Sequence, residues 1–196
     1  MTKIRTTLAL AALLLAASAP THALMAWDEA TQGDLSSDGL APTVLTIGEG
    51  INTVLGSVGS SGAGVDRDYF SFSVSAGWQL SAMILRPETG VSGSASFLAI
   101  QAGPQVTVSP TGAGAAALLG YVLYSPDQIG NNLLQDMALP GGVLGSGTYS
   151  VWVQELGGLS PYGLDLIAAE VPEPGSAALL LAGMLGTTAL KRRAVR

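Results

Sequence analysis

Short runs in which apolar and polar residues alternate dominate the middle of this chain, and long runs with helical periodicity do not occur there. The clearest run covers residues 68–74, where two phenylalanines and a valine alternate with serines. After the turn residues Ala76 and Gly77, residues 78–84 alternate again, with Leu80 and Ile84 on one face. The two runs predict a pair of strands joined as a hairpin.

A second hairpin-like pair is predicted near the end of this region, from residues 148–153 and 162–168 across two glycines. Weaker strand candidates are residues 43–47, 52–58, 96–101, 105–109 and 118–124. Seven to nine short strands separated by glycine turns are typical of an all-β fold. We therefore expect a single β-sandwich or jelly-roll-like domain over residues 24–170.

The spacing of the strand motifs resembles that of bacterial pre-peptidase C-terminal-like β-sandwich domains. The resemblance rests on D-x-D-Y-F-S-F-S-V-x-A-G at residues 66–77, G-T-Y-S-V-W-V at 147–153 and Y-x-L-x-L at 162–166. It implies a non-catalytic module of a secreted protein, and some such modules bind calcium or polymeric substrates. The Gly, Ser and Ala-rich stretch 90–117 departs from a compact version and is expected to be an inserted loop.

The amino terminus has the pattern of a secretory signal peptide. Lys3 and Arg5 precede a ten-residue apolar run, and small residues occupy the positions before Leu24 that a signal peptidase reads. We expect cleavage after Ala23, which makes residues 1–23 the signal peptide. The apolar run is too short to span a bilayer comfortably, which disfavours an uncleaved anchor.

The carboxyl terminus combines three features in a fixed order. Pro172, Glu173 and Pro174 are followed by sixteen uncharged residues and then by a basic cluster of Lys191, Arg192, Arg193 and Arg196. The prolines disfavour a helix, so the helix is expected to start after them. Sixteen helical residues reach about 24 Å, a short span for a hydrocarbon core of about 30 Å. Taken alone, this segment fits either a marginal membrane anchor or a buried helix.

Residues 171–196 as a whole resemble the PEP-CTERM protein-sorting signal, which has a Pro-Glu-Pro motif, a single transmembrane helix and an arginine-rich end. The resemblance implies that an exosortase-type membrane enzyme recognises Pro172, Glu173 and Pro174 and cleaves near them. It further implies export to the cell surface or extracellular matrix of a Gram-negative bacterium that makes exopolysaccharide, after transient anchoring in the inner membrane. The alternative is a proline-rich linker before an ordinary anchor.

Charge excludes several functions for the region between the two ends. Residues 24–171 hold 13 acidic and two basic residues, a formal charge of −11. Such a surface repels phosphate backbones, so no nucleic-acid partner is expected. The region has no histidine, lysine or cysteine, which excludes catalysis by imidazole, amine or thiolate.

Asp66 and Asp68 are the candidate metal ligands. As alternating residues at the entrance to a strand, their carboxylates can point the same way and take a hard cation such as calcium through oxygen. Possible additional oxygen ligands are the side chains of Asp34, Asp38, Asn131, Asn132 and Asp136. The alternative is that both aspartates are solvated or paired with Arg67.

Trp152 is the candidate for ligand stacking. It alternates with two valines, so it faces outward if the valines face the core, where an indole can stack on a sugar ring. The alternative is that a loop or the other sheet covers it.

A non-catalytic surface or matrix protein is the function that these features favour. A polysaccharide is the expected partner, and because the domain is acidic the glycan would be neutral or bridged by a cation. One alternative is a carboxylate-dependent glycan hydrolase using pairs such as Asp127 with Asp136 or Glu88 with Glu155. The other is a purely structural adhesin.

Overall fold

The structure is a computed structural model, and it describes residues 23–62 and 64–171. These residues form nine strands and little helix, which confirms the all-β class. The strands are β1 Ala23–Asp28, β2 Thr43–Val44, β3 Gly50–Ser61, β4 Gly64–Val74, β5 Trp78–Leu85, β6 Ser96–Ala102, β7 Leu118–Tyr124, β8 Gly147–Gln154 and β9 Ser160–Glu170. The short helical turns are α2 Glu29–Gln32, α3 Leu133–Asp136, η1 Ala115–Ala117, η2 Pro126–Gln128 and η3 Pro140–Gly142.

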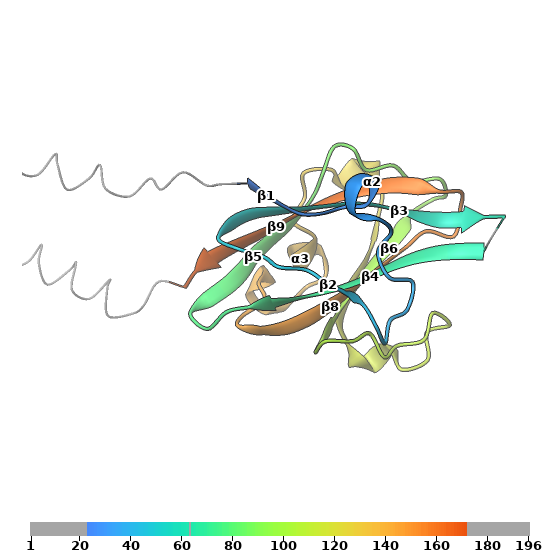
Figure 1. Cartoon of the computed structure of the whole chain (residues 1–196). Helices are drawn as coiled ribbons and strands as arrows, with labels where there is room; N and C mark the ends of the chain where they lie inside the picture. Colours follow the sequence, from blue (N-terminus) through green and yellow to red (C-terminus); the bar gives the residue numbers. More distant parts are fainter. Residues whose placement is uncertain (1–22, 63, 172–196) are drawn as a thin grey trace, which may run out of the picture.

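The strands follow one path, β5-β9-β3-β4-β8-β6-β7, with β1 added parallel to β3 and β2 added parallel to β4. β3 pairs with β9 along nine residues but with β4 along only three, at the hairpin that joins them. The sheet curls at this short contact, and its two halves face each other (Figure 1). We call β1, β3, β5 and β9 the first layer, and β2, β4, β6, β7 and β8 the second layer.

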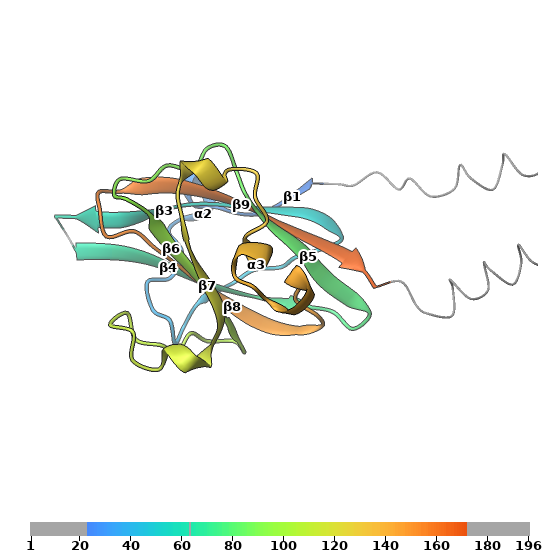
Figure 2. The ribbon, with the colours of Figure 1, turned by 180° about the vertical axis from the view of Figure 1, so that it is seen from behind.

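The hydrophobic core lies between the two layers. The alternation along each strand directs every second side chain into it, as the sequence pattern predicts. Its fully buried members include Val54, Phe70, Phe72, Leu85, Leu98, Ile100, Val151, Val153, Leu164 and Leu166. On the side between β5 and β7, α3 and η3 complete the core (Figure 2), with Leu133 and Leu134 wholly buried.

Both predicted hairpins are wrong in their pairing, although the strands themselves exist. β4 pairs with β8, and β5 pairs with β9, so the turn at Ala76 and Gly77 carries the chain from one layer to the other. β8 and β9 also follow each other in sequence without pairing: β8 pairs with β4 in the second layer, and β9 pairs with β3 in the first. Two consecutive strands with apolar inner faces can either pack face to face across the core or hydrogen-bond side by side in one sheet. Alternation of apolar and polar residues is the same in both arrangements and does not distinguish them.

A β-bulge in β5 changes which residues face the core. The register against β9 shifts between Leu80 and Ala82. Leu80 is wholly buried, and after the bulge Met83 and Leu85 are wholly buried instead of Ile84. An extra residue reverses the side-chain alternation, so the prediction that Leu80 and Ile84 share a face is wrong.

The segment 105–109 is not a strand. The Val106 N–H donates to Gly39 O at 2.8 Å, and the Thr107 N–H donates to the side chain of Gln101 at 3.0 Å. Val106 and Val108 are nevertheless buried, because they cover the outer face of the second layer. The alternation therefore reflects burial of every second residue of a loop.

Residues 1–22 and 172–196 lie outside the described part of the chain, and with them most of the expected signal peptide and nearly all of the expected sorting signal. Within residues 23–62 and 64–171, no helix has the length and hydropathy needed to cross a membrane.

Candidate functional site

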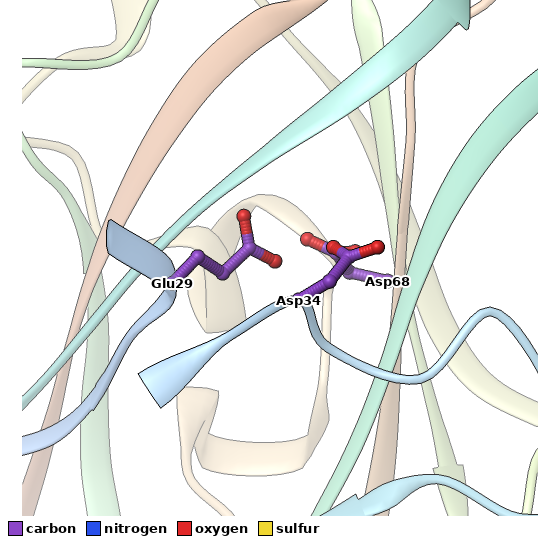
Figure 3. A group of neighbouring side chains, drawn as sticks. All are labelled: Glu29, Asp34 and Asp68. Atoms are coloured by element: carbon purple, nitrogen blue, oxygen red, sulfur yellow. The ribbon is translucent and has the colours of Figure 1, made fainter. Parts of the chain in front are cut away.

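Three carboxyl groups meet where the amino-terminal segment crosses the two layers. One oxygen from each of Glu29, Asp34 and Asp68 lies within 4.8 Å of the other two. Glu29 comes from α2, Asp34 from the loop that follows it, and Asp68 from β4. Figure 3 shows the three groups directed toward one another. We call these residues the acidic triad.

The local chain path brings Glu29 and Asp34 together. The Asp28 carboxylate caps α2 by accepting from the Ala30 N–H at 3.0 Å. One turn later the Gly33 N–H donates to Glu29 O at 3.1 Å, and Gly33 has a φ of 91°. A positive φ suits glycine, and this extended, non-helical residue ends the turn, which returns Asp34 to the side of Glu29.

Glu29 is held in place by backbone hydrogen bonds. One oxygen accepts from the Leu35 N–H at 3.1 Å, and the other accepts from the Ser57 N–H at 2.7 Å. Burial raises the pKa of Glu29, these two bonds oppose the rise, and the nearby Asp34 adds to it. Glu29 thus ties the amino-terminal segment to β3 while its charge is disfavoured.

Asp68 faces the interior, on the same side of β4 as Phe70. It is wholly buried. Its Oδ2 accepts from the Tyr162 hydroxyl at 2.7 Å, and its Oδ1 receives no hydrogen bond from a protein donor. When Asp68 holds a proton, its carboxyl can hydrogen-bond to the Glu29 carboxylate, which also raises the pKa of Asp68. Burial, reinforced by the charge of Glu29, raises the pKa of Asp68 to about 9. An unpartnered carboxylate oxygen at a buried site is costly unless a proton or a cation binds it.

Gly56 makes room for the tyrosine that supports Asp68. A Cβ at Gly56 would lie 2.7 Å from the Cζ and hydroxyl oxygen of Tyr162. Real side chains do not approach so closely, so the ring can occupy its place only above a glycine.

The triad fits a hard divalent cation. Two oxygens bound to one calcium ion at 2.3–2.6 Å are at most about 5 Å apart, which the 4.8 Å limit satisfies. Within the described residues, no basic side chain forms a salt bridge with the triad. Arg67 donates a hydrogen bond to Gln154, and Arg86 forms salt bridges with Glu88 and Asp165. The three acidic groups therefore lack a cationic partner from the protein.

The structure separates the two aspartates proposed from the sequence. Asp68 belongs to the triad, whereas Asp66 lies beside it and accepts from the Ser37 hydroxyl at 3.3 Å. Burial and the charge of Asp34 raise the pKa of Asp66. Arg67 contacts neither aspartate through a salt bridge; its Nε donates to Gln154 at 2.6 Å.

The other proposed oxygen donors have different environments. Asp34 is part of the triad, but the Asn132 side chain caps α3 and accepts from the Met83 N–H at 3.1 Å. The Asp38 carboxylate accepts from the Leu40 N–H at 2.9 Å. Sequence reasoning missed Glu29 and Tyr162, which come from segments far from β4. The one local pattern that could have pointed to Glu29 is Asp28 directly before it, a residue type that commonly caps the start of a helix.

Trp152 is on the outer face of the second layer, but it is covered. Its side chain is 4% exposed and packs with Tyr69, Phe97 and the loop residues Val106 and Val108. The ring centroids of Trp152 and Phe97 are 4.7 Å apart in an edge-on arrangement. Of the two alternatives for Trp152, the structure shows the covered one, so the Trp152 ring is closed to a sugar.

Glu88 and Glu155, one of the pairs considered for hydrolysis, have structural partners. Glu88 pairs with Arg86 at 2.6 Å. Glu155 is buried and accepts from the Ser96 hydroxyl at 2.8 Å and from the Gly157 N–H at 2.7 Å. Burial alone would raise the pKa of Glu155, but these hydrogen bonds outweigh it and the pKa is lowered. A general acid needs the opposite shift.

A scan against protein-family models and a search of curated proteins both find no match for this chain.

Proposed function

We propose that this chain is an exported, non-catalytic β-sandwich protein of the cell surface or extracellular matrix, whose acidic triad binds calcium. The observation that carries the calcium proposal is the unpartnered, wholly buried Oδ1 of Asp68 beside the carboxylates of Glu29 and Asp34. Calcium would hold the amino-terminal segment, β3 and β4 together.

Burial favours a cation site over a hydrolase. A glycosidase must place two carboxyl groups on either side of a sugar bond, where both touch substrate. Asp68 has no exposed surface and cannot touch a glycan. The triad therefore supports a structural ion.

The location rests on the chain ends. The expected signal peptide, residues 1–23, and the resemblance of residues 171–196 to the PEP-CTERM signal support export followed by processing near Pro172, Glu173 and Pro174. The proposed partners are signal peptidase, an exosortase-type enzyme and, through binding or structure, a polysaccharide of the envelope. A structural adhesin without a soluble glycan ligand is the second candidate.

Thermal melting of the processed protein tests the calcium proposal. Extracellular calcium modules have dissociation constants of about 10⁻⁴–10⁻³ M, so 10 mM calcium would stabilise the fold by about 1.4–2.7 kcal/mol. For a domain of this size we expect the melting temperature to rise by about 3–10 °C. Magnesium should raise the melting temperature less than calcium does, because it loses its bound water less readily.

The variant Asp68→Asn should fold and lose the calcium response, since the amide keeps the shape and the acceptor for Tyr162. Asp127→Asn removes the same charge from an exposed position of η2 and should respond as the unaltered protein does. An equal calcium shift in both variants would refute the site.

Mass measurement tests the location. The protein recovered from the outer fraction of its host should begin at Leu24 and end near residues 172–174. A chain that still ends at Arg196 would make the tail a membrane anchor and remove the support for a matrix setting.

A further inference from the structure

β7 is an open edge of the second layer. It pairs with β6 on one side and is the last strand of the path. Within the described residues, no backbone hydrogen bond joins residues 119–123 to a segment other than β6. The opposite edge, β5, is covered through bridges at Asn132 and Leu144. At β7, Met137 and Leu139 pack against Gly120, and the Gln128 side chain donates to Leu123 O, but no strand pairs with this edge within the described residues. Backbone N–H and C=O groups at an edge without a partner strand can pair with another strand.

The side chains at this edge are apolar and exposed. Leu119, Tyr121 and Leu123 are 45%, 60% and 59% exposed. Tyr121 stacks on Phe97 with ring centroids 5.9 Å apart, and beside them a hollow is lined by Leu118, Leu123, Trp152 and Leu156 among others. Leu156 is 67% exposed. Contiguous exposed apolar surface of this kind marks an interaction site.

The same region carries no charge. Residues 89–126 contain no acidic or basic residue, although residues 24–171 have a formal charge of −11. Natural edges are normally protected by a charged residue or a proline, and β7 has neither. Two copies of this chain repel each other over most of their surface, and β7 is a place where they can approach without opposing charges.

The sequence of β7 is symmetric in the way that pairing with itself requires. Residues 119–123 read Leu-Gly-Tyr-Val-Leu. In an antiparallel contact centred on Tyr121, that tyrosine meets its own copy and Leu119 lies opposite Leu123 of the second chain. The same patch then serves both partners, as a two-fold contact demands.

We propose that β7 is a homodimer interface, in which two copies pair edge to edge in antiparallel fashion about Tyr121. The contact extends the second layer into a continuous sheet across both chains. The Gln128 side chain, which donates to Leu123 O at 3.3 Å in an exposed position, gives way to a backbone N–H of the second chain. This proposal does not depend on the acidic triad.

Sedimentation equilibrium of the processed protein tests the proposed β7 homodimer. We expect a concentration-dependent dimer that strengthens as sodium chloride is raised, because salt screens the repulsion between two acidic chains. Tyr121→Lys places two like charges face to face and should weaken dimerisation by about tenfold or more. Leu40→Lys alters a side chain of similar exposure, 58%, outside the edge and should dimerise normally.

A charge exchange tests the register. Tyr121→Lys and Tyr121→Glu should each dimerise about tenfold or more weakly than the unaltered protein when alone, and should form a heterodimer when mixed, since opposite charges then meet at the centre. Melting curves of each variant verify that it is folded. A monomeric unaltered protein at millimolar concentration, or a dimer that tolerates both single variants, would overturn the proposal.

Discussion

Asp68 has two ways to be stable in its buried position. It can hold a proton, because its pKa is raised to about 9 and the carboxyl is then protonated at neutral pH. Alternatively, it can bind a cation together with Glu29 and Asp34. The two states compete because calcium requires the carboxylate. Calcium binding near neutral pH is therefore expected to release a proton.

The pH dependence of calcium-free protein should reveal the protonated state. A carboxyl whose folded pKa is raised to about 9 stabilises the fold fully below its unfolded pKa near 4. That contribution is lost as the pH rises toward 9. With a chelator present, the melting temperature should fall between pH 5 and pH 9, more steeply for the unaltered protein than for Asp68→Asn. Equal slopes would show that Asp68 does not titrate as described.

Gly56 offers a test at a residue that is not itself charged. Gly56→Ala should displace Tyr162, destabilise the fold by about 1–3 kcal/mol in urea unfolding and weaken calcium binding. Gly48→Ala is the control, because a Cβ there meets nothing within 4 Å. Indistinguishable unfolding of the two variants would contradict the role of Gly56.

Only part of the triad could be predicted from sequence. Asp68 stands out because it precedes an alternating strand beside Asp66. Glu29 is 39 positions away and reaches Asp68 only through the folding of α2 against β3. A carboxylate recruited by tertiary contact leaves no local spacing pattern, so sequence reasoning chose Asp66 as the partner instead.

Among the elements, calcium should act on the amino-terminal segment. Glu29 receives the N–H groups of Leu35 and Ser57, so fixing its carboxylate also fixes α2 against β3. In hydrogen exchange, we expect calcium to slow the amides of residues 29–36 and 56–58, with little change in β6. Uniform slowing over all strands, or none in these segments, would argue against local binding.

The strands were predictable and their pairing was not. Alternation locates β4 and β8 and gives the bounds of β7 as residues 118–124, because burial of one face imposes a period of two. The partners of β4, β5, β8 and β9 depend on which layer each joins, and short turns such as the one at Gly77 connect either kind of neighbour. β1 was not predicted at all, since its burial does not alternate: its first three residues are exposed and its last three are half-buried.

For the whole molecule, the large negative charge affects both cation binding and association between chains. A domain with 13 acidic and two basic residues gains from any bound cation, and it can approach an acidic polysaccharide only when a cation lies between them. The triad and the uncharged edge of β7 are two separate places where that repulsion is reduced. In the proposed account, calcium would stabilise one chain and the β7 edge would join two.

Native mass spectrometry of the processed protein in millimolar calcium tests directly whether the acidic triad binds calcium. We expect one calcium ion for each chain of the unaltered protein and none for Asp68→Asn, with Asp127→Asn behaving as the unaltered protein. An unaltered protein that carries no calcium, or an Asp68→Asn variant that retains it, would show that the acidic triad is not a calcium site.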